Sequence, residues 1–206
     1  MKPRRGAWAG LLLVAMLGAA HAAPPEEAII PVERYSTEKA KLLASTHKTR
    51  LRQIYDNVYR CYEWMDIRRL SFVSPREATG DDRYLTLWVE IVQQMTPAFA
   101  AAPPHRRAST MFQHYGIDLL RRTSSHQPFL RDPALAGFGV ILTWTKPGGE
   151  PKREAPGVNE TLALFVDKTT LERFLQRQTQ PAEFVRRAII NGFDGTTRLG
   201  RFALEI

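Results

Sequence analysis

Two alternating segments, separated by a connector rich in proline and glycine, most constrain the fold of this chain. In residues 137–145, large apolar side chains occupy every second position: Phe138, Val140, Leu142 and Trp144. Residues 162–167 repeat the pattern with Leu162, Leu164 and Val166. A two-residue period is that of a β-strand. The connector, residues 147–160, holds three prolines and three glycines, which is typical of a long hairpin loop. We therefore expect the two strands to pair antiparallel.

Three further strands are predicted from the same period. In residues 84–92, aliphatic side chains alternate with a mixed group of side chains that includes Trp88 and Glu90. Residues 198–206 form the expected closing strand, and residues 68–73 a shorter one. One aliphatic and one mixed face are typical of a sheet with helices on a single side.

Helical patterns lie between and before these strands. Residues 37–66 carry apolar side chains at helical spacing and form an N-terminal helical extension. Residues 107–122 read as a helix interrupted at Gly116. A capping box of Thr169 and Glu172 predicts the start of the next helix, and a last helix begins at Pro181 and ends at Asn191-Gly192.

Counted from Tyr84, the elements follow the order strand, helix, strand, strand, helices, strand. This order resembles the split β-α-β arrangement of ferredoxin-like two-layer domains. We therefore predict an α+β fold, with an antiparallel sheet in residues 84–206 and the helical extension in residues 37–66, all within a single domain of residues 37–206. Such an architecture hosts unrelated functions, so it implies no activity.

The first 22 residues are typical of a secretory signal peptide. Lys2, Arg4 and Arg5 precede a short apolar run that ends in Ala20-His21-Ala22. We expect cleavage after Ala22 and a periplasmic or extracellular protein, followed by a proline-rich tether in residues 23–36. An uncleaved anchor and a twin-arginine signal are the alternatives. No later stretch is apolar enough to span a membrane.

The charge of the chain owes much to this segment. Removing it takes away three basic side chains and no acidic one, so the formal net charge falls from +8 to +5. That charge favours weak contact with anionic surfaces. We do not expect a nucleic-acid partner. An exported chain leaves the cytoplasm, where nucleic acid is found, and the sequence does not interleave aromatic residues with basic ones.

Cys61 is the only cysteine of the chain, so no disulfide can form within it. It falls in a helical apolar pattern with Leu51, Ile54 and Val58. Free cysteine is among the most buried residue types, and we expect Cys61 to be buried. An intermolecular disulfide is the alternative.

The sequence contains no local catalytic, metal-binding or cofactor motif. No two histidines have the spacing of a metal pair, and the G-x-S-x-G, phosphate-loop and dinucleotide patterns are absent. Two carboxylate pairs, Glu26-Glu27 and Asp81-Asp82, lie in the expected tether and in a turn, where adjacent side chains point apart. We therefore assign no catalytic residue, no metal ligand and no cofactor.

Four arginine pairs admit two interpretations. They are Arg68-Arg69, Arg106-Arg107, Arg121-Arg122 and Arg186-Arg187. If the fold gathers them, they form an anion-binding rim, because guanidinium groups suit phosphate and carboxylate. Alternatively they solvate helix ends and faces, and we favour this second interpretation.

The best binding candidates lie on the mixed face of the predicted sheet. They are Trp88, Glu90, Thr143, Thr145, Arg201 and Glu205. An aromatic ring among hydroxyls and charges is a plausible binding surface. We favour the alternative that the N-terminal helix packs on this face through Ile54, Tyr55, Val58 and Tyr62, because apolar patches seldom stay exposed.

The sequence leaves two classes of function open. The favoured class is an exported, non-enzymatic module that binds another envelope protein or a surface polymer through the mixed face and the loop of residues 147–160. The alternative is a hydrolase or small-ligand enzyme whose site is assembled from distant residues. Its first polar candidates are Glu90, His114, Asp118 and His126. Convergence of two of them in one pocket would favour the enzyme.

Overall fold

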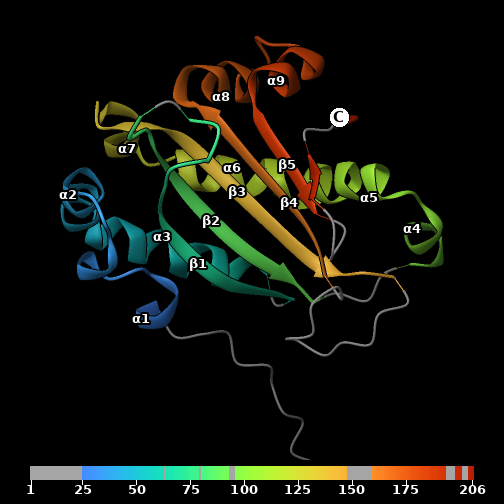
Figure 1. Cartoon of the computed structure of the whole chain (residues 1–206), viewed down its shortest axis with the longest axis horizontal. Coiled ribbons are helices and arrows are strands. Elements are labelled where there is room, and N and C mark those ends of the chain that lie inside the picture. Colours follow the sequence, from blue (N-terminus) through green and yellow to red (C-terminus); the bar gives the residue numbers. More distant parts are fainter. Residues whose placement is uncertain are drawn as a thin grey trace, which may run out of the picture.

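The structure is a computed structural model that describes residues 25–62, 64–78, 80–92, 96–147, 159–193, 198–200 and 204–206. The expected signal peptide and residues 148–158 of the long connector lie outside these ranges. Within them the chain has an α+β fold, in which helices cover one face of a single sheet (Figure 1).

Six strands of the described residues lie side by side in chain order. They are β1 (Met65–Val73), β2 (Arg83–Ile91), β3 (Leu135–Thr145), β4 (Asn159–Asp167), β5 (Ile189–Phe193) and β6 (Arg198–Gly200). β2 and β3 pair parallel, and the other neighbouring pairs are antiparallel. The hairpin expected on either side of the long connector is β3 with β4, with Val140 opposite Leu164.

The strand order differs from the split β-α-β order expected for residues 84–206. In a split arrangement another strand separates the two parallel strands. Here β2 and β3 are direct neighbours, with Leu87 opposite Val140. The chain between them holds helices, as a crossover between adjacent parallel strands requires. The sheet is therefore mixed, and the expectation of an antiparallel ferredoxin-like sheet is wrong.

Helices α3, α5 and α6 form a layer behind the sheet in Figure 1, and α2, α4, α7, α8 and α9 lie around its edges and ends. The helices of the described residues are α1 (Pro25–Ala28), α2 (Glu38–Thr46), α3 (Lys48–Cys61), α4 (Pro97–Ala101), α5 (Pro104–Met111), α6 (Ile117–Ser124), α7 (Gln127–Arg131), α8 (Lys168–Leu175) and α9 (Pro181–Arg187), with a 3₁₀ turn at Val32–Arg34 and a π-turn at Phe112–Gly116. Among the described residues, no helix has the length and apolar character needed to cross a membrane.

The core lies between this helix layer and the aliphatic face of the sheet. Fully buried sheet residues include Leu70, Leu85, Leu87, Phe138, Leu142, Leu162 and Leu164. Helix α3 contributes Ile54, Tyr55 and Val58, all buried, and contacts β1 and α6. The N-terminal helix therefore belongs to the helix layer, and the favoured expectation that it packs on the mixed face is wrong.

The segment expected to be a tether instead packs along the outer edge of β1. Ala28 and Tyr35 are buried, and Ile29 forms a parallel bridge with Leu70. The backbone N–H of Phe72 donates to Tyr35 Oη at 3.1 Å. These contacts cover a strand edge that would otherwise be open to pairing.

The C-terminal part of the chain differs from the expected helix and strand. Helix α9 ends at Arg187, and residues 189–193 form β5, because Ile190 pairs beside Leu164 and is buried there. Residues 201–203 lie outside the described part. Beyond them, Glu205 leaves the sheet: its backbone N–H donates to Ser109 Oγ of α5 at 2.9 Å.

Two further expectations are corrected at helix ends. Cys61 is exposed, because it is the last residue of α3 and falls beyond the buried stripe that ends at Val58. The cap of α8 is Asp167, whose carboxylate accepts from the backbone N–H of Thr170 at 2.8 Å. Thr169 lies within that helix, so the predicted capping box does not form.

Candidate functional site

The face of the sheet that bears Trp88, Thr143 and Thr161 carries no helix of the described residues, and we call it the open face. Figure 1 shows this face of β2, β3 and β4 toward the viewer. Alternation along each strand puts these side chains opposite the buried aliphatic ones. Four of the six predicted binding residues share this face: Trp88, Glu90, Thr143 and Thr145.

Trp88 is held in one orientation across two strands. Its indole Nε1–H donates to Thr143 Oγ1 at 3.0 Å, and Thr143 Oγ1 lies 3.1 Å from Thr161 Oγ1. Thr143 is buried, whereas Trp88 is half-buried. The hydroxyl pair thus fixes the indole across β2 and β3 and leaves part of the ring accessible from the open face.

Two successive arginines reach the open face because β1 is irregular at residues 67–69. In a regular strand, neighbouring side chains point to opposite faces, but a bulge changes that alternation. Arg68 forms an ion pair with Glu90, and the Arg69 guanidinium carbon lies 5.7 Å from the centroid of the Trp88 ring. Arg68 and Arg69 are both exposed, and the Arg69 guanidinium lies over the indole ring.

The other two predicted binding residues do not join this group. Arg201 lies outside the described residues. Glu205 is on the helix side, where its backbone oxygen accepts from Gln113 Nε2 at 2.7 Å. Glu90 is buried and paired with Arg68, so it positions that arginine and does not present a free carboxylate.

The four residues proposed for an enzymatic site do not converge. Within the described ranges, no hydrogen bond or ion pair joins any two of Glu90, His114, Asp118 and His126. His114 is exposed on the π-turn. His126 packs against Phe129, and burial, helped by the charge of Arg50, lowers its pKa.

Asp118 belongs instead to a network with Tyr62 and Arg122. It accepts a short hydrogen bond from Tyr62 Oη and one of 2.7 Å from Arg122 Nε. Burial, together with the bond to Asp118, raises the pKa of Tyr62 to about 12. Burial opposes ionisation of Asp118, but the bonds from Tyr62 and Arg122 outweigh it and hold the pKa of Asp118 below its ordinary value. Asp118 therefore stays charged and Tyr62 stays neutral near neutral pH. Because neither group gains or loses a proton there, the pair suits a structural role better than acid–base catalysis.

A second carboxylate contact joins the turn between α2 and α3 to the segment before β3. His47 Nε2 lies 2.8 Å from Asp132 Oδ2, and the buried imidazole packs on Phe129 with ring centroids 4.4 Å apart. Its Nδ1 has no partner among the described residues. No group of three histidine, cysteine or acidic side chains in the described ranges could hold a metal ion.

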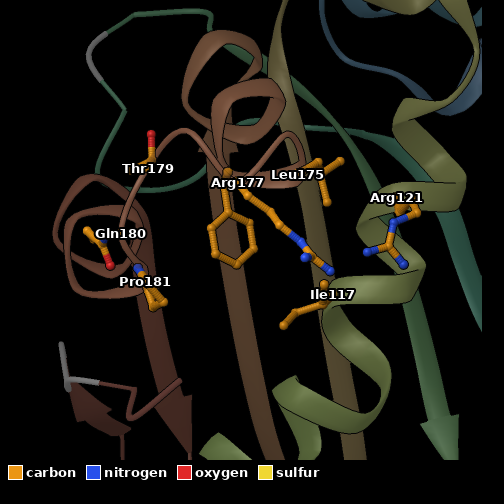
Figure 2. Close-up of a pocket in the computed structure, with 8 residues that line it drawn as sticks. Ile117, Arg121, Leu175, Arg177, Thr179, Gln180 and Pro181 are labelled. Carbon is orange, nitrogen blue, oxygen red and sulfur yellow. The ribbon is translucent and has the colours of Figure 1, made fainter.

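A hollow of about 380 Å³ lies where α6 meets the connection from α8 to α9 (Figure 2). Its apolar lining comes from Ile117, Phe174, Leu175 and Pro181, and its polar lining from Arg121, Arg177, Thr179 and Gln180. Sequence patterns do not reveal it, because the lining comes from segments about 60 positions apart that only the fold brings together.

Arg177 has a backbone conformation that seldom suits a side chain. Its φ is 60°, in the left-handed region, at the position after a helix where glycine is preferred. Gln178 N donates to the carbonyl of Arg173 at 2.8 Å and Arg177 N to that of Phe174 at 3.0 Å, which is the Schellman end of α8. An arginine in place of glycine costs about 1 kcal/mol there.

The open face and this hollow are the candidate binding surfaces considered for function; a smaller hollow of about 250 Å³ lies between the segment of residues 29–33 and helices α2 and α3. They must be interpreted from their own geometry, because comparison of the chain with protein-family models, with curated protein sequences and with solved structures gave no match.

Proposed function

We propose that this chain is an exported, non-enzymatic module that binds an acidic polysaccharide of the cell envelope through its open face. The observation that carries the proposal is the fixed orientation of Trp88, between the hydroxyl of Thr143 and the guanidinium of Arg69, on a sheet face that no helix of the described residues covers. We propose a non-catalytic role because the four candidate residues of an enzymatic site, Glu90, His114, Asp118 and His126, do not converge.

A flat face with one accessible aromatic ring suits an extended polymer. Sugar rings stack on indole faces, and their hydroxyls bond to side-chain hydroxyls such as those of Thr145 and Thr161. An ordered indole also loses little side-chain entropy on binding, because its rotamer is already fixed by Thr143.

The charges next to Trp88 favour an acidic polymer over a neutral one. Arg68 is neutralised by Glu90, whereas no carboxylate of the described residues forms an ion pair with Arg69. A guanidinium binds a carboxylate through paired hydrogen bonds. Arg69, whose guanidinium lies over the indole, would therefore take a uronate group, and the neighbouring sugar ring would contact the part of Trp88 that Arg69 leaves accessible. The net charge of +5 expected for the exported chain acts in the same direction.

Binding to immobilised polygalacturonate tests the proposal. We expect the exported form of the chain to be retained on this polymer and to pass through neutral dextran. Arg69→Gln should weaken retention about tenfold, because a charge-assisted hydrogen bond contributes about 1.5 kcal/mol. Trp88→Ala should weaken it at least as much.

Arg131→Gln is the matched control, because Arg131 is an exposed arginine on α7, away from the open face. It should leave retention unchanged at constant salt. Equal weakening by Arg131→Gln and Arg69→Gln would show general charge attraction and contradict the proposed face. Retention on an immobilised envelope protein, without retention on the polysaccharide, would contradict the polysaccharide as partner and favour a protein partner.

Export is tested separately from binding. We expect residues 1–22 to direct the chain out of the cytoplasm and the processed chain to begin at Ala23. Cell fractionation with N-terminal sequencing of the product measures both. An unprocessed chain in the cytoplasmic fraction would contradict the envelope assignment and leave the binding measurement intact.

A further inference from the structure

The hollow between α6 and the α8–α9 connection combines two arginines with an apolar lining, which the open face does not. Two arginines from different segments, Arg121 of α6 and Arg177 after α8, line one cavity together with four apolar residues. In Figure 2 both side chains extend their guanidinium groups toward the same part of the hollow, near Ile117. Like charges gathered on an apolar wall repel one another unless an anion lies between them.

Arg121 has only a weak partner of its own. Its Nη1 lies 3.4 Å from Asp118 Oδ1, and that carboxylate already accepts bonds from Tyr62 and Arg122. A long, exposed contact of this kind contributes little and leaves most guanidinium N–H groups of Arg121 available. No carboxylate of the described residues forms an ion pair with Arg177.

The conformation of Arg177 supports a binding role. Glycine would end α8 at this position without strain, yet the chain has an arginine whose side chain enters the hollow. A strained residue at a cavity is typical of a functional site, since the fold alone would favour the unstrained choice.

Packing on both sides holds the apolar wall in place. Phe174 stacks on the buried Phe184, with ring centroids 4.0 Å apart. On the opposite side, the π-turn fixes the start of α6, because Ile117 N donates to the carbonyl of Phe112. A preformed apolar wall next to two cations suits a ligand that has both an apolar body and a charged head.

We propose that this hollow binds a small amphiphilic anion, with a carboxylate or phosphate head between Arg121 and Arg177 and an apolar body against Phe174 and Ile117. Its volume lies within the range of ordinary small-ligand sites. The site shares no residue with the open face, so it is independent of the polysaccharide proposal.

Titration calorimetry with short-chain probes tests the site. Octanoate or octyl phosphate should bind at least tenfold more tightly than acetate, inorganic phosphate or uncharged octyl glucoside. The tighter of the two octyl anions identifies the head group. Octyl glucoside binding as tightly as the anions would show a merely apolar hollow and overturn the proposal.

Arg177→Gly separates binding from folding. The substitution relieves the left-handed strain, so the melting temperature should stay the same or rise, while affinity for the octyl anion falls about tenfold. Arg121→Gln should weaken binding similarly, and Arg173→Gln, an exposed arginine of α8 outside the lining, should not. Unchanged affinity in Arg177→Gly, in a protein that melts at or above the original temperature, would refute the site.

Discussion

Arg107 and Glu160 form an ion pair that is enclosed between α5 and the sheet. Arg107 Nε donates to Glu160 Oε2 at 2.8 Å, and the two residues are only 6% and 1% exposed. Trp144 Nε1 donates to the same oxygen at 2.8 Å, and the carbonyl of Ala102 accepts from Arg107. The pair therefore fastens the crossover helices to the starting end of β4.

Glu160→Gln should destabilise the fold by about 3 kcal/mol, because it leaves Arg107 as a buried charge without a counterion. Urea unfolding followed by circular dichroism measures the change. Glu172→Gln, at an exposed position of α8, should alter stability by less than about 0.5 kcal/mol. A loss below about 1 kcal/mol for Glu160→Gln would mean that the enclosed pair contributes no more than a surface pair.

Gly116→Ala should destabilise the π-turn by about 1–3 kcal/mol. A Cβ at this position would lie 2.3 Å from Phe112 Cδ2, and the Phe112 ring cannot withdraw because it is fully buried beside Phe184. In an ordinary helix the same change would be favourable by up to about 1 kcal/mol. Thermal unfolding measures whether Gly116→Ala lowers or raises the stability, with His114→Ala as a control in the same turn.

The network of Tyr62 and Asp118 predicts how stability depends on pH at both extremes. The folded-state pKa of Tyr62 is about 12, above the ordinary value of 10. Its contribution is therefore complete below about pH 10 and is lost as the pH rises toward 12. The pKa of Asp118 is lowered in the fold, so its contribution is present above about pH 4 and is lost as the pH falls below that value.

Tyr62→Phe should flatten the alkaline arm of the stability profile and lower neutral stability by about 1–2 kcal/mol, because it removes the hydrogen bond to the charged Asp118. Asp118→Asn should flatten the acidic arm. Urea midpoints measured across the pH range give both arms. An alkaline arm that is identical in Tyr62→Phe would contradict the raised pKa of this phenol.

Deletion of residues 152–155 should lower the recovery of envelope components that copurify with the chain. These residues lie in the connector after β3, which the sequence predicts to be a charged loop. A second chain, with the four residues replaced by glycine and serine, keeps the length and removes the charge. Full recovery with both variants would exclude the loop from the binding surface.

The sequence predicted the elements of the sheet better than their order. Alternation identified β2, β3 and β4, because Leu87, Val140 and Leu164 each belong to a two-residue period that burial enforces. Pairing is not local: nothing in residues 84–92 specifies that β3 lies directly beside them. At β5, Asn191-Gly192 imitates a helix end, and only the contact of Ile190 with β4 selects the strand.

In the candidate sites too, local sequence patterns predicted some residues, whereas others depend on contacts made only in the folded chain. Trp88 and Thr143 were predictable, since alternation places both on the mixed face. The bulge that turns Arg68 and Arg69 to one side depends on the pairing of β1 with β2. Arg177 carries no local signal, because its left-handed conformation comes from the way α8 ends in the folded chain.

The parallel seam between β2 and β3 joins two parts of the sheet that are each built from chain neighbours. β1 pairs antiparallel with β2, and β3 to β6 pair antiparallel in chain order, with α8 and α9 between β4 and β5. Local contacts can assemble each part quickly, whereas closing the seam requires ordering the long crossover first. We therefore expect docking of the two parts to be the slow step of folding, with the hydrogen bonds of the seam the last to gain protection from exchange.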